Sequence, residues 1–95
     1  MTFVRHFLAS GTSGEFGATV RKHRAMVCAR EGFVSLRQLR PTTGASDSEK
    51  VLLLEFQNEA QLMSWRGSDE HKEIAAGYRR LWAREPEVQI FITEE

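Results

Sequence analysis

Residues 50–82 read KVLLLEFQNEAQLMSWRGSDEHKEIAAGYRRLW, and this stretch decides the fold. Its first part, over 51–57, is apolar apart from Glu55 and Gln57, which predicts a strand buried on both sides. Asn58 follows, with Gln61 three residues further on, in the arrangement that caps the beginning of a helix. The stretch therefore predicts a strand that leads directly into a helix.

Gly67 divides that helix in two. The first part carries Leu62 and Trp65 at a spacing of three, and Ser68 is a second N-cap with acidic residues in the turn that follows. An apolar stripe at helical spacing then runs through His71, Ile74, Ala75, Tyr78, Leu81 and Trp82. We therefore expect a broken helix whose apolar side packs on the strand before it.

The N-terminal half contains two further strands around one helix. Residues 2–9, TFVRHFLA, carry large or β-branched side chains in both phases and predict the first strand. Thr12 and Glu15 fit a capping box for a helix that extends to about Arg30. One side of this helix carries Phe16, Val20, His23 and Val27. Gly32 stands where a left-handed residue ends a helix.

The remaining segments are read from their turn formers. Residues 33–40, FVSLRQLR, predict a strand that Pro41 stops, and residues 41–48, PTTGASDS, predict a mobile hairpin loop. Pro86 ends helical geometry, so residues 87–94, EVQIFITE, predict the last strand.

The order strand, helix, strand, strand, helix, strand predicts a single α+β domain over residues 1–95. Right-handed crossovers pack such a chain as a ferredoxin-like βαββαβ unit, with a four-stranded antiparallel sheet and both helices on one face.

The uncovered face of that sheet predicts a homodimer. Apolar residues occupy both phases of all four strands, so roughly eight large side chains would face water, at about 1.5 to 2 kcal/mol each. That total approaches the whole stability of a small domain, about 5 to 15 kcal/mol. A second copy packed sheet to sheet would cover the face. The alternative is a monomer whose second face is only partly apolar, since Arg5, Ser35, Arg37 and Glu55 lie on strands.

Composition excludes several classes of partner. Thirteen basic residues balance 13 acidic ones, so the chain lacks the basic excess that nucleic-acid binding requires. No apolar run is long enough to span a bilayer, and Arg5 and His6 interrupt the N-terminal segment, so we expect a cytoplasmic protein. Cys28 is the only cysteine and is expected to pack beside a helix as an unreactive thiol.

The run LEFQNEAQLMSWRGSDEHKE resembles the antibiotic-biosynthesis-monooxygenase family of dimeric α+β barrels. Members carry an acidic-aromatic pair at the end of the third strand, then a Trp, a Ser and a His at steps of three. Those positions hold Glu55, Phe56, Trp65, Ser68 and His71 here. The likeness extends to GTSGEF, GFVSLRQLR and the last strand, and it implies a small oxygenase of aromatic, phenolic or quinol molecules that needs no cofactor.

Two chemistries of the family lack their residues in this chain. Haem-degrading relatives use an Asn and an axial His at places that hold Val4 and Ala75 here. Relatives that oxygenate polyketides use an Asn and a Trp on the third strand, where this chain has Leu52 and Phe56.

The resemblance and strand alternation together predict a pocket between the sheet and the second helix. His71 and His6 are the candidate bases that would take a phenolic proton, because burial keeps an imidazole neutral near pH 7. The substrate-binding candidates are Trp65, Tyr78, Phe56, Leu52 and Val4. His23, between Lys22 and Arg24, is expected to be a solvated edge residue.

Other readings of the same residues remain open. Each candidate histidine or tryptophan would serve equally well in a core or an interface. If these side chains are only structural, the chain is a non-catalytic dimer that binds a small hydrophobic ligand. Three histidines without a carboxylate ligand set predict no metal site. A third possibility is haem binding through His71 or His6.

Overall fold

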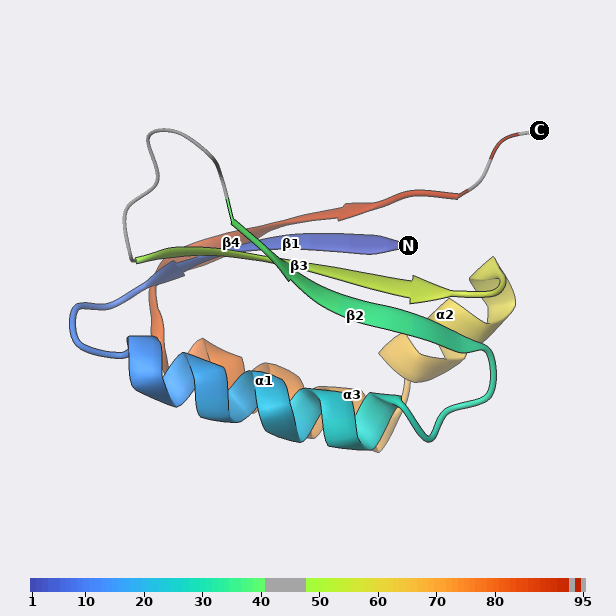
Figure 1. The fold of residues 1–95 in the computed structure, drawn as a ribbon, viewed down its shortest axis with the longest axis horizontal. Coiled ribbons are helices and arrows are strands. Elements are labelled where there is room, and N and C mark those ends of the chain that lie inside the picture. Colours follow the sequence, from blue (N-terminus) through green and yellow to red (C-terminus); the bar gives the residue numbers. More distant parts are fainter. Residues whose placement is uncertain (41–47, 93, 95) are drawn as a thin grey trace.

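The structure is a computed structural model that describes residues 1–40, 48–92 and 94. Its elements follow the predicted order, with the second helix in two pieces (Figure 1). They are β1 (Thr2–Leu8), α1 (Ser13–Val27), β2 (Phe33–Leu39), β3 (Glu49–Phe56), α2 (Glu59–Arg66), α3 (Asp69–Arg79) and β4 (Trp82–Ile90). The predicted hairpin loop falls mostly on residues 41–47, outside the described residues.

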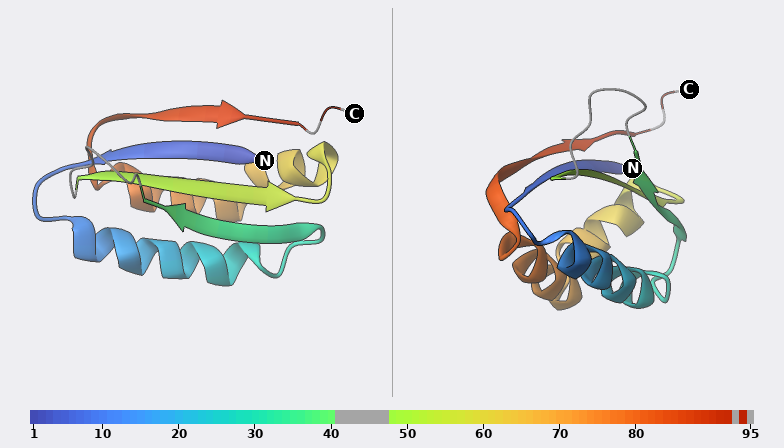
Figure 2. Two further views of the ribbon diagram at one scale, coloured as in Figure 1. Left: turned by 45° about the horizontal axis from the view of Figure 1, so that its top comes forward. Right: turned by 60° about the vertical axis from the view of Figure 1, so that its left-hand side comes forward.

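The four strands form one antiparallel sheet in the order β2-β3-β1-β4. Val4 in β1 lies opposite Leu52 of β3 on one side and Val88 of β4 on the other. Paired residues share a face, so these three side chains point the same way. All three helices lie on that face of the sheet (Figure 2), which confirms the ferredoxin-like prediction.

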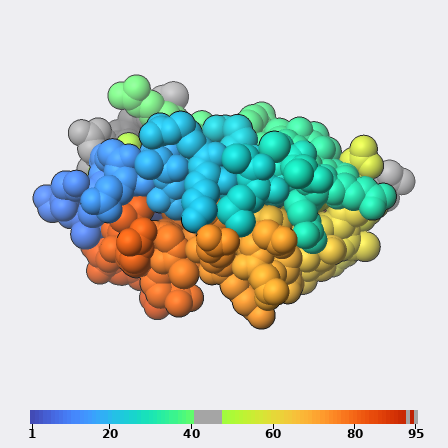
Figure 3. Space-filling view, turned by 90° about the horizontal axis from the view of Figure 1, so that it is seen from below, coloured from blue at the N-terminus to red at the C-terminus, as the bar shows by residue number. Residues whose placement is uncertain are grey.

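The core lies between the sheet and the helices. Seen from the helix side, α1 and α3 run next to each other beneath the sheet (Figure 3). Trp65 and Phe16 are fully buried there, and one cluster of apolar side chains connects both helices to the inner face of β1 and β3. No helix among the described residues has the length and apolar character needed to cross a membrane.

Local capping explains the break between α2 and α3. The Asn58 side chain accepts a hydrogen bond from the backbone N of Gln61 at 2.9 Å. Ser68 Oγ accepts one from the backbone N of His71 at 3.1 Å, so both predicted caps are confirmed. The capping box at Thr12 was wrong: its hydroxyl donates backward to the carbonyl oxygen of Ala9 at 2.7 Å.

The last strand begins earlier than predicted. The predicted stripe continued the helix to Trp82, but α3 ends at Arg79 and β4 begins at Trp82. Pro86 therefore lies within a strand instead of ending a helix. The strand accommodates it because β4 is at the edge of the sheet, and the register with β1 shifts between Arg5 and Phe7.

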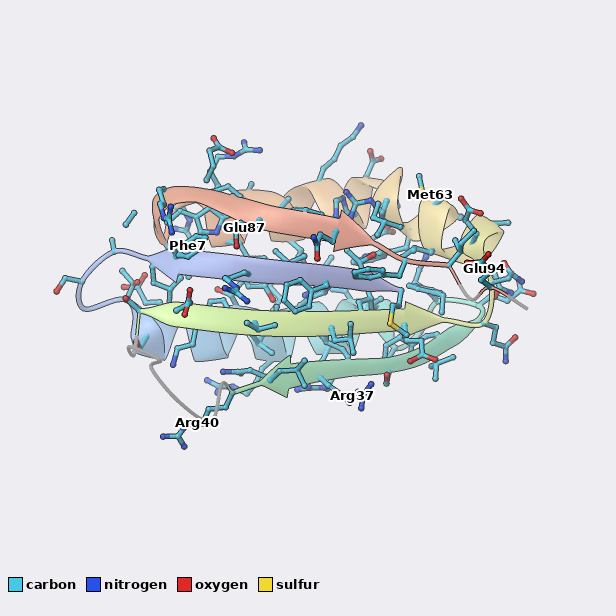
Figure 4. The ribbon with its side chains drawn as sticks, turned by 90° about the horizontal axis from the view of Figure 1, so that it is seen from above. Phe7, Arg37, Arg40, Met63, Glu87 and Glu94 are labelled. Atoms are coloured by element: carbon cyan, nitrogen blue, oxygen red, sulfur yellow. The ribbon has the colours of Figure 1, made fainter. Side chains whose placement is uncertain are left out.

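The outer face of the sheet is less apolar than predicted. Phe7, Arg37 and Glu87 lie on this face (Figure 4), so charged and aromatic side chains are interspersed. Arg5 lies 3.7 Å from both Glu49 and Glu87 across the strands. The strand register places five apolar residues on this face, fewer than the roughly eight predicted: Phe3, Phe7, Leu39, Val51 and Leu53. Val88 and Ile90 are exposed, yet they belong to the inner face, beyond the cover of the helices.

Two predictions about α1 have different outcomes. Gly32 has φ +84°, the left-handed conformation that its position after the helix predicted. Cys28 does not pack as expected. It lies at the C-terminal end of α1 with an exposed side chain, and its Sγ lies 3.5 Å from the carbonyl oxygen of Ala25.

Candidate functional site

A cavity of about 160 Å³ lies between the inner face of the sheet and helices α2 and α3. Engineered cavities of about 150 Å³ hold a benzene molecule, so this space suits a ligand of one aromatic ring. The described residues that line it are Thr2, Val4, His6, His23, Leu36, Leu52, Leu54, Trp65, Arg66, His71, Ile74, Ala75, Tyr78, Trp82, Pro86 and Val88. Its walls are therefore mostly apolar and aromatic.

Six of the seven site residues predicted from the sequence lie in this lining. They are Val4, His6, Leu52, Trp65, His71 and Tyr78. Phe56 is buried but lies outside the cavity, because it comes at the end of β3, where its ring packs edge-on against Phe33 at 6.2 Å. The places of the relatives' haem-binding Asn and His, Val4 and Ala75, both contribute apolar wall.

His6 points from β1 toward α3, and its ring centroid lies 4.7 Å from that of Tyr78. Only 3% of the residue is exposed, and burial lowers its pKa from 6.5 to about 4. The indole Nε1 of Trp82 donates a hydrogen bond to His6 Nδ1 at 3.0 Å. An indole N–H can only donate, so Nδ1 is the unprotonated nitrogen, and the neutral ring carries its hydrogen on Nε2. His6 is therefore a hydrogen-bond donor through Nε2. Because its unprotonated Nδ1 already accepts from Trp82, His6 is poorly placed to act as a base.

His23 was missed as a site residue. It was expected at a solvated edge, but it is 7% exposed and lines the cavity, because α3 packs against the side of α1 that carries it. Its Nδ1 lies 2.8 Å from the Tyr78 hydroxyl. Burial, followed by the charges of His71, His6 and Arg24, lowers the pKa of His23 to about 4. Its place in the helical stripe with Phe16 and Val20 was the signal that should have located it.

His71 is the most accessible of the three histidines. Ser68 caps the backbone in front of it, and its side chain is half-buried. Burial lowers its pKa, and the nearby Arg66 guanidinium lowers it further. A hydrogen bond to the Arg66 backbone acts in the opposite direction, as expected when a ring N–H donates to a carbonyl. In a neutral ring with such a bond, the other ring nitrogen is an acceptor.

Trp65 connects the two histidines of the helices. Its ring stacks on His23, with centroids 5.8 Å apart and planes 14° from parallel, and it meets His71 edge-on at 5.7 Å. Tyr78, bonded to His23, stays a neutral phenol because burial raises its pKa. An indole, a phenol and three imidazoles therefore surround the space, and all are neutral near pH 7.

Arg66 is the one permanently charged residue in the described lining, and no carboxylate is part of it. Within the described ranges, no group of three or more His, Cys, Asp or Glu side chains is placed to hold a metal ion. The polar side chains of this lining are hydrogen-bonding groups in a mostly apolar space.

Three solved structures similar to this chain share its fold over almost their whole length. A conserved protein from Methanosarcina mazei is 17% identical and aligns over 98% of this chain and 90% of its own, with a TM-score of 0.86. A candidate antibiotic biosynthesis monooxygenase from Caulobacter crescentus is 17% identical, with 99% and 88% covered and a TM-score of 0.84. SnoaB, a cofactor-independent oxygenase from Streptomyces nogalater, is 20% identical, with 98% and 93% covered and a TM-score of 0.74.

This chain has the antibiotic biosynthesis monooxygenase fold. No protein-family model matches the sequence, and no curated protein does so either. At 20% identity or less the likeness establishes the monooxygenase fold, while the role of each cavity residue has to be argued from its own surroundings. The ferredoxin-like fold predicted from the order of strands and helices is therefore confirmed.

Proposed function

We propose that the protein is a cofactor-independent monooxygenase of small phenolic or quinol molecules, with its active site in the cavity. The observation that carries this proposal is the convergence of neutral, hydrogen-bonding aromatic side chains on an apolar space of one-ring size. SnoaB, which has the same fold, is a cofactor-independent oxygenase, and this supports the reaction class.

His71 is the proposed base. It combines a lowered pKa with partial exposure, so its neutral ring accepts a phenolic proton and can later exchange it with solvent. His6 complements it, because its Nε2–H is a donor suited to stabilising the phenolate oxygen. Val4 and Leu52 supply apolar wall, which favours the flat face of a ring.

The proposed reaction balances without an external reductant. The phenolate passes one electron to O₂, and the resulting radical and superoxide combine to form a C–O bond at the ring. Loss of water from that hydroperoxide consumes the ring C–H and breaks the O–O bond. A phenol and O₂ thus give a quinone and water. One atom of O₂ enters the quinone beside the original phenol oxygen, the other leaves as water, and the proton held by His71 returns to that leaving oxygen.

Oxygen uptake tests this proposal. One-ring and two-ring phenols and quinols are supplied in air-saturated buffer, and the wild-type rate is compared with that of heat-denatured protein. We expect His71→Gln to lower the rate by about 100-fold or more, as for loss of a general base. The exposed neighbour variant Lys72→Gln should keep the full rate. With ¹⁸O₂, one label should enter the quinone and one the water.

Binding of a phenol or quinol without any oxygen uptake would favour the alternative, a non-catalytic protein that binds a small aromatic ligand. Uptake unchanged in both His71→Gln and His6→Gln would remove the proposed mechanism. Haem fits the cavity poorly, since a four-pyrrole ring is much larger than the one-ring space. A haemin titration that produced a Soret shift lost in His71→Gln would contradict this.

We further propose that the protein works as a homodimer with the sheets back to back. The mixed outer face still presents Phe3, Phe7, Leu39 and Leu53, which a second copy would cover. Leu53 lies near the middle of this face, opposite Phe3 and Arg37, so Leu53→Arg should dissociate the dimer. Sedimentation of the wild type at one chain's mass would overturn the proposal.

A further inference from the structure

Three buried polar atoms, each on a residue of the cavity lining, have no hydrogen-bond partner among the described residues. They are Thr2 Oγ1, His23 Nε2 and Trp65 Nε1, and their residues are 3%, 7% and 0% exposed. A buried donor or acceptor without a partner costs free energy, so folded proteins contain few of them. Their concentration around one cavity indicates that its contents supply the missing partners.

Two of these atoms belong to rings in contact. The rings of His23 and Trp65 are stacked, 14° from parallel with centroids 5.8 Å apart. The indole Nε1 of Trp65 can only donate a hydrogen bond. His23 already uses Nδ1 in its bond to the Tyr78 hydroxyl, so Nε2 is the nitrogen that remains for a ligand.

The bond to Tyr78 allows His23 Nε2 to be an acceptor. When His23 Nδ1 carries the hydrogen and donates it to the Tyr78 oxygen, Nε2 presents a lone pair. Because burial lowers the pKa of His23 to about 4, the ring is neutral and that lone pair is free near pH 7. A donor from Trp65 and an acceptor from His23 then lie on adjacent rings.

One hydroxyl group satisfies both atoms at once, because it accepts one hydrogen bond and donates another. An ether oxygen accepts but cannot donate, and a hydrocarbon does neither. We propose that His23 is a ligand-binding residue that, with Trp65, hydrogen-bonds a hydroxyl group of a one-ring phenol or quinol and so selects phenols over their ethers. In a quinol, this is the hydroxyl that His71 does not deprotonate. This inference rests on the proposed function for the aromatic class of ligand, and it adds the residue that recognises the hydroxyl.

Three probes test the selection: p-cresol, 4-methylanisole and toluene, all titrated without oxygen so that the phenol cannot be oxidised. All carry the same methylated ring. 4-Methylanisole carries a methyl group on the phenol oxygen, and toluene lacks the oxygen. Toluene therefore shows the effect of losing the hydrogen bonds without the added bulk of the ether methyl group. In a calorimetric titration of the wild-type protein near pH 7, we expect p-cresol to bind at least about tenfold more tightly than either of the others.

Variants of His23 test whether the preference for p-cresol depends on Nε2 of this residue. His23→Asn keeps an amide near the place of Nδ1, where it can pair with Tyr78, and it removes the Nε2 end. His23→Gln reaches the place of Nε2 with its own amide. We expect the preference for p-cresol to fall to within about twofold in His23→Asn and to return in part in His23→Gln. Lys72→Gln, at an exposed position outside the cavity lining, serves as the control and should keep the preference.

A measurement on the wild type avoids any dependence on folding of the variants. The ¹⁵N resonance of His23 Nε2 should shift on addition of p-cresol and stay in place on addition of the same concentration of toluene. Equal binding of p-cresol and toluene would overturn the inference, since the unpartnered atoms would then be satisfied by water. A preference unchanged in His23→Asn, or no binding of any probe, would overturn it as well.

The outcomes separate this inference from the proposed reaction. A preference for p-cresol that depends on His23, together with no oxygen uptake from any phenol, removes the oxygenase proposal and leaves the binding role. Uptake that depends on His71 in a protein without hydroxyl preference removes the role of His23 and leaves the oxygenase proposal.

Discussion

Trp82 donates its indole hydrogen to Nδ1 of His6 at 3.0 Å, and this bond links the first residue of β4 to the middle of β1. The two residues are 76 positions apart in the sequence, and their ring centroids lie 6.1 Å apart. Because the indole cannot accept, the bond selects one tautomer of a buried, neutral imidazole. The sheet therefore sets which nitrogen of His6 carries a hydrogen.

The tautomer of His6 is directly measurable. In wild type, ¹H–¹⁵N correlation spectra near pH 7 should show His6 protonated at Nε2 and bare at Nδ1. In Trp82→Phe the donor is lost, so we expect His6 to populate both tautomers and its two ¹⁵N shifts to move toward each other. Trp65→Phe has no bond to His6 and is the control. A wild-type His6 protonated at Nδ1 would contradict the assignment.

Stability should fall as the pH is lowered from about 7 to 5. Burial lowers the pKa of His6 and His23 from 6.5 to about 4, so between these values the unfolded chain binds more protons than the folded one. Both imidazoles are neutral in the folded and unfolded chain above about pH 6.5, so the free energy of unfolding is highest there. It decreases as the pH falls from about 6.5 toward 4. The expected loss at pH 5 is about 2 kcal/mol for each histidine, measured by urea unfolding. His71 contributes in the same direction.

A variant without one of these groups provides the control for the pH effect. His23→Leu cannot be protonated, so its unfolding free energy should change with pH by roughly half as much as that of the wild type. Equal stability of the wild type at pH 7 and pH 5 would show that the two imidazoles are not buried.

The two helix caps should differ in their effect on the site. Asn58→Ala and Ser68→Ala each remove a side-chain bond to a helix N-terminus and should each cost about 1 kcal/mol in the free energy of unfolding. Ser68 also donates to the carbonyl oxygen of Trp65 at 2.6 Å, so it connects two residues of the cavity wall. Only Ser68→Ala should therefore move the NMR signals of His71. Identical His71 signals in both variants would argue against this connection.

Gly32 should be the least replaceable glycine among those described. It has φ +84°, and a Cβ there would collide with the side-chain amide of Gln61. We expect Gly32→Ala to cost about 2 kcal/mol or more by thermal or urea unfolding. Gly14 in α1 has open space around it, so Gly14→Ala should raise stability by about 0.4 to 1 kcal/mol. Similar stability of the two variants would contradict the strain at Gly32.

The features that the sequence predicted correctly depend on interactions over a few residues. Asn58 and Ser68 were identified as caps because a cap bonds to a backbone N–H three positions away, wherever the rest of the chain lies. Alternation along β1 placed His6 on the helix side, since neighbouring side chains in a strand point to opposite faces. Thr12 shows the limit of such patterns: a carbonyl acceptor three residues back competed with the cap.

The chain's own pattern thus determined the order of strands and helices and the break at Gly67, while the side of the sheet that the helices cover was predicted only with the help of the family resemblance. Tertiary structure decided the chemistry of the cavity. His23 became part of the site because α3 packs on that side of α1, and Trp82 became a partner of His6 because the edge strand pairs with β1. Burial and hydrogen-bond partners set the proton state of an imidazole, and both come from residues distant in sequence.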